Sequence, residues 1–221
     1  MTDTHATTPT TDHETEVRSR RAQEWAEWAA EHYQDFAALE REWPHIADGF
    51  AQAAASETRD DQLVIDYTVA LMSWFMVRRD WDTALMWLNE AVHACQALAD
   101  DEMLAVMYNR GGLIYCLRGV YSEGFNWYSR ALPLFEKLGD RAALATVEGN
   151  LGLLAVAMGD RTAEQHLKRA SLLNMQLGNL SSEAQFVEQV LVTLLTRGWD
   201  AAATLAAMRL RAIAEETDRS S

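Results

Sequence analysis

The chain has little proline, little cysteine and no long hydrophobic run. Its 221 residues include three prolines and two cysteines. No stretch approaches the 18 or more apolar residues that read as a membrane-spanning helix. Scarce proline, with abundant alanine and leucine, favours helix along most of the chain. The opening residues, MTDTHATTPTTDHETE, have neither a basic start nor an apolar segment. We therefore expect no signal peptide, no membrane partner and a cytoplasmic location.

Basic residues are too few and too dispersed for a nucleic-acid-binding protein. The chain has 19 Lys and Arg residues against 33 Asp and Glu residues, which gives a formal charge of -14. Its only dense basic run is Arg18–Arg21. A surface that follows a phosphate backbone needs clustered cations, so we expect no nucleic-acid partner.

Motifs that carry chemistry are missing as well. The sequence contains no CxxC, HxxxH, HExxH, GxSxG or GxxxxGK[ST] pattern. Cys95 and Cys116 lie inside apolar helical patterns, where buried and reduced thiols are expected. We predict no catalytic residue, no metal and no cofactor. An enzyme would require a convergent His–carboxylate cluster in a deep pocket.

What the chain does contain is a repeat with a period of about 40 residues. Small, aromatic and boundary positions recur together, with one deletion in the turn near residue 161. The matching sets are Ala91, Ala131 and Ala170; Ala84, Gly124 and Ala163; Met72, Gly112 and Gly152; Arg79, Gly119 and Gly159; Trp81 and Tyr121; Trp87 and Trp127.

Each unit reads as two helices. In the second unit we expect helices from about Asp101 to Arg118 and from about Tyr121 to Leu138. Gly119 suits a left-handed cap after the first helix, and Asp140 suits the cap of the next one. Gly112 and Gly124 should let the paired backbones approach closely. Such pairs stack into an array with a continuous core.

At these residues the chain resembles the tetratricopeptide repeat (TPR) family. The signature positions are matched by Gly112, Tyr115, Gly119, Tyr121, Gly124, Tyr128 and Ala131. The 40-residue period is similar to the long-helix variant of kinesin light chains and bacterial signalling proteins. The resemblance implies an all-α fold, a right-handed superhelical solenoid of antiparallel helix pairs.

The expected organisation is a tail, an N-terminal helical pair and the repeats. Residues 1–15 read as a disordered, Thr-rich tail. Residues 16–60 read as the pair, with one helix ending near Arg41 and another starting at Pro44. Residues 61–221 hold the repeats, whose expected bounds are 61–100, 101–140, 141–180 and 181–218. The stretch LEREWPHIADGF resembles the junction before the repeats of large bacterial signal-transduction ATPases, but their nucleotide-binding motif is absent, so no ATPase activity is implied.

The resemblance also implies a binding face, because the first helix of each unit lines the concave side in this family. Arg110 and Asn150 match positions where the family binds peptide carboxylates, but Ala70 fills that position in the first repeat. The mixed lining therefore favours an amphipathic helix or an extended apolar segment as the ligand. The expected partner-binding residues are Ser73, Met76, Asn109, Arg110, Leu113, Asn150, Leu153 and Gln189.

We therefore interpret the chain as a non-enzymatic scaffold or adaptor that binds a protein partner in signalling. Binding could use the concave face or the Trp-rich N-terminal end, where Trp25, Trp28 and Trp43 lie. The alternatives are a peptide-responsive sensor, a self-assembling homo-oligomer, and a groove filled by the N-terminal helices or a second copy.

Overall fold

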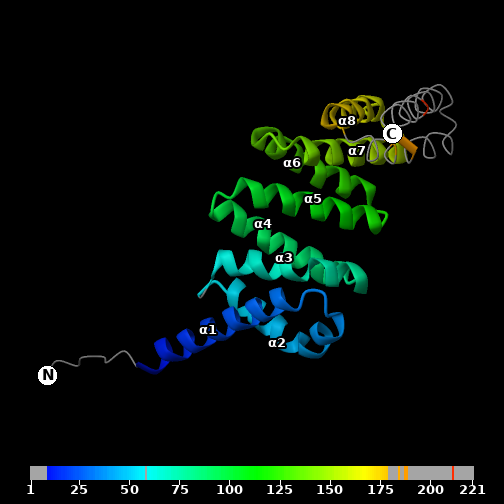
Figure 1. Cartoon of the computed structure of the whole chain (residues 1–221). Coiled ribbons are helices and arrows are strands. Elements are labelled where there is room, and N and C mark those ends of the chain that lie inside the picture. Colours follow the sequence, from blue (N-terminus) through cyan, green and yellow to red (C-terminus); the bar gives the residue numbers. More distant parts are fainter. Residues whose placement is uncertain (1–8, 58, 179–183, 185–186, 189–210, 212–221) are drawn as a thin grey trace. The chain divides into compact units, whose positions relative to one another are not determined.

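The computed structural model describes residues 9–57 and 59–178, together with the single positions 184, 187, 188 and 211 (Figure 1). All of its regular elements in this part of the chain are α-helices. Their bounds are α1 Pro9–Glu31, α2 Phe36–Ala54, α3 Asp61–Arg78, α4 Trp81–Ala97, α5 Asp101–Leu117, α6 Tyr121–Leu138, α7 Arg141–Met158 and α8 Ala163–Leu177. The expected all-α repeat of helix pairs is confirmed.

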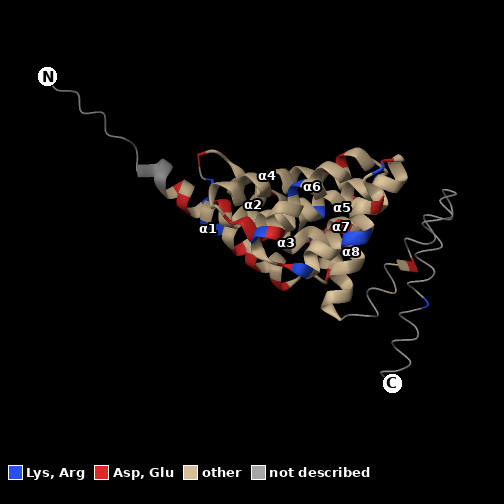
Figure 2. Cartoon of the chain, turned by 90° about the horizontal axis from the view of Figure 1, so that it is seen from above, with Lys and Arg blue, Asp and Glu red and all other residues tan. Residues whose placement is uncertain are grey.

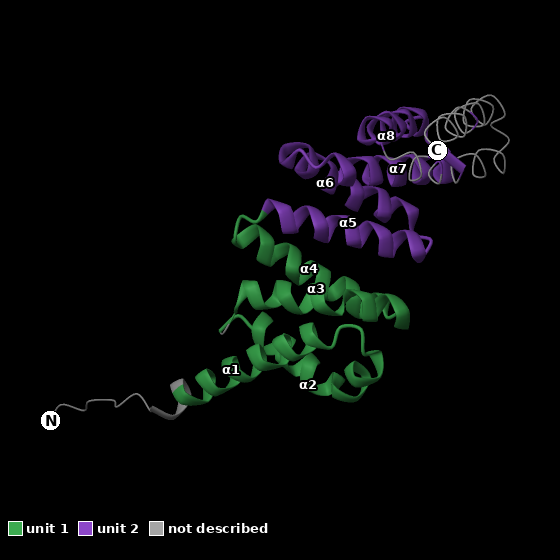
Figure 3. Cartoon of the chain, viewed as in Figure 1, with its two compact units in different colours: residues 1–100 green, residues 101–221 purple. Residues whose placement is uncertain are grey.

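The chain divides into two compact units, unit 1 from Met1 to Asp100 and unit 2 from Asp101 to Ser221 (Figure 3). Unit 1 contains α1 to α4, and the described part of unit 2 contains α5 to α8. The boundary coincides with a repeat boundary expected from the sequence. The pairs α3/α4, α5/α6 and α7/α8 each fall within one expected repeat. The fourth expected repeat, 181–218, lies almost wholly outside the described residues.

Every repeat helix except α8 is followed by the same type of turn. After α6, for example, the Gly139 amide donates to the Glu136 carbonyl and the Asp140 amide donates to the Phe135 carbonyl. Gly139 has a φ of 71°, which is the left-handed conformation that this turn needs. The Asp140 side chain then accepts the Ala143 amide hydrogen at 2.9 Å, and so caps α7. One turn thus satisfies the end of one helix and the start of the next.

Close packing within unit 2 depends on glycine, as predicted for Gly112 and Gly124. A Cβ added at Gly124 would lie 3.2 Å from the Gly112 carbonyl oxygen. A Cβ at Gly111 would lie 2.1 Å from the Trp127 ring. In α7, the corresponding Gly152 faces Leu167, and an added Cβ would lie 3.2 Å from the Leu167 backbone nitrogen. These glycines set the distance between the paired helices.

The N-terminal pair corrects two expectations. The helix α1 begins at Pro9, within the segment expected to be disordered. The helix α2 begins at Phe36 and continues through Pro44, whereas the sequence predicts a helix that starts at Pro44. The reason is Asp35, whose side chain accepts the Ala38 amide hydrogen at 3.0 Å and caps α2 earlier. Pro44 lies on an exposed side of the helix, where water can satisfy the carbonyl that its missing N–H leaves unpaired.

An aromatic core joins α2 to the first repeat. The Phe50 ring stacks on Trp87 at 3.7 Å between centroids, and Trp43 packs on Trp74 at 4.6 Å. The Tyr67 hydroxyl donates a hydrogen bond of 2.6 Å to the Ala22 carbonyl of α1. Gly49 makes room for that hydroxyl, since an added Cβ would lie 2.0 Å from it. The N-terminal pair is therefore packed as part of unit 1.

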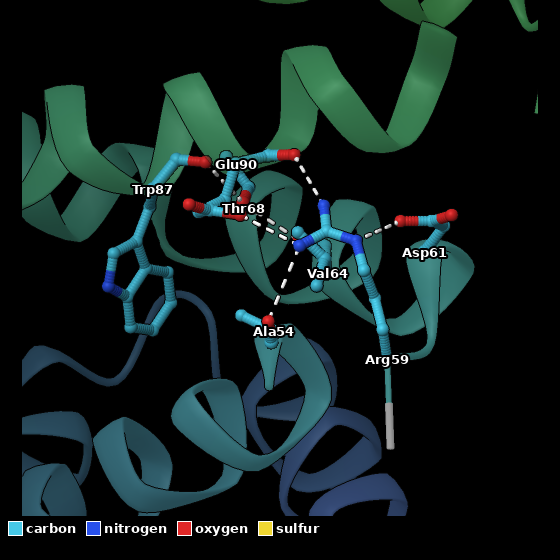
Figure 4. Close-up of polar contacts among 7 residues, drawn as sticks. All are labelled: Ala54, Arg59, Asp61, Val64, Thr68, Trp87 and Glu90. Atoms are coloured by element: carbon cyan, nitrogen blue, oxygen red, sulfur yellow. Dashed lines mark hydrogen bonds and ion pairs between the residues drawn. The ribbon is translucent and has the colours of Figure 1, made fainter. Parts of the chain in front are cut away.

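Arg59 connects three helices of unit 1 (Figure 4). Its guanidinium donates to the Ala54 carbonyl at the end of α2, at 3.3 Å, and to the Asp61 carboxylate in α3, at 2.7 Å. It also donates to the Glu90 carboxylate in α4, at 2.9 Å. The hydrogen bond to Glu90 raises the pKa of Arg59 above its ordinary value. Arg59 thus fixes the chain between α2 and α3 against α4.

Candidate functional site

In each of the three described repeats, the first helix is covered on every side except one narrow stripe. On α3, nine residues are buried, among them Tyr67, Leu71 and Trp74, and they cover all of the helix surface outside the stripe. The remaining positions are exposed, apart from the half-buried Asp61, Ala70 and Met76. We call this line the α3 stripe: Gln62, Asp66, Val69, Ser73, Met76 and Val77. The predicted binding residues Ser73 and Met76 both belong to it.

The corresponding line on α5 contains three predicted binding residues. Leu113 is 43% exposed, while Asn109 and Arg110 are half-buried. Burial lowers the pKa of the Arg110 guanidinium from its ordinary value. Within the described part of the chain, Arg110 and Asn109 have no hydrogen bond or ion pair through their side chains. We call this line the α5 stripe: Glu102, Val106, Asn109, Arg110, Leu113 and Leu117.

On α7, Asn150 and Leu153 occupy the positions that Arg110 and Leu113 occupy on α5. Both are half-buried, and no partner of the Asn150 amide lies among the described residues. We call this line the α7 stripe: Ala142, Thr146, Asn150, Leu153 and Ala157. Gln189, the last predicted binding residue, lies outside the described residues. In unit 2, the uncovered lines on both first helices thus carry predicted residues.

The N-terminal helices do not cover the α3 stripe. Both α1 and α2 pack against α3, but through its other sides, and Val69 and Val77 remain 39% and 63% exposed. Trp43, one of the tryptophans considered for an exposed patch, belongs to the aromatic core instead. Trp25 and Trp28 are half-buried, stacked on His45 and His32 with centroids 5.0 and 4.1 Å apart.

The two units differ greatly in charge. Unit 1 contains seven arginines, no lysine and nineteen Asp or Glu residues, so that it carries -12 of the total formal charge of -14. Acidic positions outnumber basic ones along α1, α2 and α3 (Figure 2). The charges on the stripes also differ: the α3 stripe carries Asp66, and the α5 stripe carries Glu102 and Arg110.

A buried charged cluster in unit 2 was not predicted. The Glu148 side chain, on α7, is 1% exposed, and its Oε2 lies 2.7 Å from His166 Nδ1 on α8. Arg169 Nη1 lies 2.9 Å from Glu148 Oε1, an ion pair without hydrogen-bond geometry. Arg169 also pairs with Glu136 of α6. The cluster therefore connects α6, α7 and α8.

The repeat could have revealed this cluster. Glu148 occupies the position of Thr68 and Tyr108, at the same 40-residue spacing. Its partner His166 lies 39 residues after Trp127. This is the repeat spacing of 40 residues less the one-residue deletion near residue 161. The contact is equivalent in all three repeats, because the Thr68 hydroxyl lies 3.5 Å from the Trp87 carbonyl and the Tyr108 ring packs on Trp127. A charged pair thus replaces contacts to tryptophan in the third repeat.

Neither cysteine is suited to nucleophilic chemistry. Burial raises the pKa of the Cys95 thiol to about 12 and that of the Cys116 thiol to about 11. Both are therefore protonated near neutral pH, and a thiol is a far weaker nucleophile than a thiolate. Among the described residues, no group of three or more His, Cys, Asp and Glu side chains is arranged to bind a metal. The helices described here also include none with the length and hydropathy needed to cross a bilayer.

Known structures share this fold at low sequence identity. BtubC (BKLC) from P. vanneervenii aligns with a TM-score of 0.63 and 17% identity, over 98% of this chain and 93% of that chain. A putative kinesin light chain from Podosopora anserina, with nearly identical TPR-like repeats, gives a TM-score of 0.68 and 15% identity, over 91% and 98%.

Aspartyl phosphate phosphatase F from Bacillus subtilis aligns with a TM-score of 0.58 and 11% identity, over 87% of this chain and 60% of that chain. No family model and no curated protein matches the sequence. The repeat period, the helix pairs and these structural likenesses agree: the chain has a TPR-like helical-repeat fold.

Proposed function

We propose that the protein is a non-enzymatic interaction scaffold that binds a segment of a partner protein along its first-helix stripes. In unit 2 the binding residues are Asn109, Arg110 and Leu113 of α5, with Asn150 and Leu153 of α7. The observation that carries the proposal is the set of half-buried polar side chains on these stripes that have no partner in the described chain. A ligand can bind to these groups in place of water.

Arg110 is the main anchor in this proposal. Its guanidinium is partly removed from water, which costs free energy that no carboxylate among the described residues offsets. A ligand that brings a carboxylate or carbonyl oxygen to Arg110 would recover part of that cost. Asn109 and Asn150 each offer a donor and an acceptor, which matches the N–H and C=O groups of a peptide backbone.

The apolar members of the stripes define the rest of the ligand. Leu113 and Leu153 occupy equivalent positions on α5 and α7, next to the polar anchors. The ligand is thus an extended or amphipathic segment with apolar side chains and one oxygen acceptor for Arg110. Ser73 and Met76 on α3, and Gln189 in the fourth expected repeat, belong to the same proposed class of surface.

Three features support a binding role over catalysis. The thiols are protonated near neutral pH, as their raised pKa values indicate. Among the described residues, one His–carboxylate pair has a buried carboxylate: His166 with Glu148. Arg169 forms an ion pair with the same carboxylate and balances its charge, so the pair has a structural role. The known structures that share the fold include a putative kinesin light chain that is described by its TPR-like repeats. We expect the protein to act in the cytoplasm, where free thiols persist.

Selection from a random peptide library would test the proposal. Peptides are selected against the full chain, and the dissociation constants of the best binders are measured by fluorescence anisotropy. The variant Asn109→Ala/Arg110→Ala/Asn150→Ala should weaken binding about tenfold or more, because it removes the three proposed polar anchors of the ligand. Arg141→Ala/Asn126→Ala/Asn174→Ala removes the same residue types from outside the stripes and should change binding less than about twofold.

Equal affinities of the two triple variants would contradict the proposal. Circular dichroism of both variants verifies that the helices are retained. Sedimentation of the free protein at two concentrations separates ligand binding from self-assembly.

A further inference from the structure

The α3 stripe has the spacing of a helix-packing seam. Gln62, Asp66, Val69, Ser73 and Met76 follow one another at intervals of four, three, four and three residues. This heptad spacing keeps one line of side chains facing a second helix along the full length of both. Among the described elements, α1, α2 and α4 pack against other sides of α3 and leave this seam uncovered.

The chemistry changes along the stripe. In its first half, the Gln62 amide donates a hydrogen bond of 2.9 Å to the Asp66 carboxylate, and no Arg or Lys among the described residues pairs with that carboxylate. In its second half, Val69 and Val77 are exposed and Met76 is half-buried. The stripe thus offers one oriented negative charge, followed by an apolar surface.

The rest of unit 1 reinforces the negative charge. Several of its arginines are engaged elsewhere, Arg59 with Asp61 and Glu90, and Arg78 with Glu40. With a formal charge of -12 on unit 1, a cationic segment is attracted and an anionic one repelled. The same charge disfavours unit 1 of a second copy of this chain as the occupant, since two strongly negative surfaces would meet.

We propose that the α3 stripe binds a cationic amphipathic helix of a partner protein. This inference rests on the proposed function and specifies the partner for unit 1. A Lys or Arg of the partner pairs with Asp66, and its apolar residues pack on Val69, Met76 and Val77. Asp66 and Val77 are separated by roughly 16 Å along the helix axis, so the partner's cation and its last apolar contact lie about three turns apart.

Model peptides of roughly 20 residues would test the inference. The peptides share one apolar heptad seam and carry Lys, Gln or Glu at the position opposite Asp66. Their binding to the full chain is measured by fluorescence anisotropy, at two salt concentrations. We expect the Lys peptide to bind most tightly, and Asp66→Asn to weaken it about fivefold to tenfold. Asp66→Lys should reverse the order, so that the Glu peptide binds more tightly than the Lys peptide.

A matched control addresses non-specific attraction to an acidic protein. Glu31 is exposed in α1, also within unit 1, and lies outside the stripe. Glu31→Lys makes the same change in charge and should leave the order of the peptides unaltered. Val77→Asp should weaken all three peptides, since it places a charge in the apolar half of the seam.

Several results would overturn the inference: no peptide binding, equal binding of the Lys and Glu peptides, or the same response to Glu31→Lys and Asp66→Lys. A dimer that dissociates when Val77→Asp is introduced would assign the stripe to a second copy and would also overturn it. The proposed function is judged separately, by the response of library-selected peptides to the α5 and α7 variants. If those variants release their ligands while the model peptides fail at α3, only the inference is lost.

Discussion

Unit 1 and unit 2 use the same helix pair, but they fill its equivalent positions differently. Between the helices of a pair, Thr68 meets Trp87 in unit 1, whereas unit 2 uses Tyr108 with Trp127 and the charged Glu148 with His166. After the helices, unit 1 places Arg79 and Ala99 in the left-handed turns, and unit 2 places glycine there. The backbone geometry is shared although the side chains are not.

The difference shows which positions the fold constrains. A turn that needs a positive φ accepts a non-glycine residue at an energetic cost, and a packing position accepts an ion pair if its charges balance. The stripes have no such packing role, and their residues differ between the units: at the 40-residue spacing Asp66 aligns with Val106, and Arg110 aligns with Ala70. The binding chemistry can therefore vary from repeat to repeat while the packing is maintained.

The largest expected effect comes from removing the aromatic core of unit 1. Trp87 is buried and packs on Phe50, Tyr67 and Phe75. Trp87→Ala should reduce the free energy of unfolding by about 3–5 kcal/mol, because it leaves a large cavity between α2, α3 and α4. Urea denaturation, followed by circular dichroism, measures the change. A loss below about 1 kcal/mol would mean that α2 does not depend on this core.

The charged cluster should be the next most sensitive contact. His166→Ala removes one partner of the buried Glu148 carboxylate and should cost about 2–3 kcal/mol. The triple variant Glu148→Tyr/Leu151→Gly/His166→Trp transfers the contact of the second repeat, with the space that Gly111 leaves for the Trp127 ring, into the third. We expect its stability to lie within about 1 kcal/mol of wild type, since a packed apolar pair replaces a buried ion pair. Thermal and urea unfolding measure the stability of both variants. If both lose a similar amount of stability, these positions of the third repeat are not equivalent to those of the second.

The turns give a smaller effect of opposite sign in the two units. Ala99 has a φ of 54° and Gly139 has a φ of 71°, so both adopt the left-handed conformation. Ala99→Gly should stabilise unit 1 by about 1 kcal/mol, and Gly139→Ala should destabilise unit 2 by about 1 kcal/mol. Amide hydrogen exchange resolves the two units within one sample. Changes of the same sign would contradict the shared turn geometry.

The stripes should matter least for stability. Asp66→Asn and Arg110→Gln each remove a charge that no described residue pairs with, so the free energy of unfolding should change by less than about 0.5 kcal/mol. Chemical denaturation measures both. A loss of 2 kcal/mol or more in either variant would show that its charge stabilises the folded chain and is not reserved for a ligand.

The repeat period was sufficient to predict the helix pairs, the caps at Gly119 and Asp140 and the close approach of Gly112 to Gly124. These features depend on local conformation and on small residues, which a single sequence displays. The start of α2 was mispredicted, because the capping role of Asp35 competes with the preference of Pro44 for a first turn. The partners of Arg59 were missed, since a long-range ion pair leaves no periodic pattern. The pair Glu148 and His166 was missed although the repeat aligns both residues with the contacts to tryptophan in the earlier repeats.

For the site, the sequence indicated which helix faces to consider, and the structure adds that these faces carry uncovered stripes. The lack of a partner for Arg110 could not be predicted, because it depends on what every neighbouring side chain does.

Hydrogen–deuterium exchange of the full chain, with and without a library-selected peptide, tests the central claim most directly. Binding to the first-helix stripes predicts added protection in α5 and α7, centred on residues 109–113 and 150–153, and its disappearance in the Asn109→Ala/Arg110→Ala/Asn150→Ala variant. Protection confined to α1, α2 or the second helices α4, α6 and α8 would contradict the claim that the stripes bind the partner.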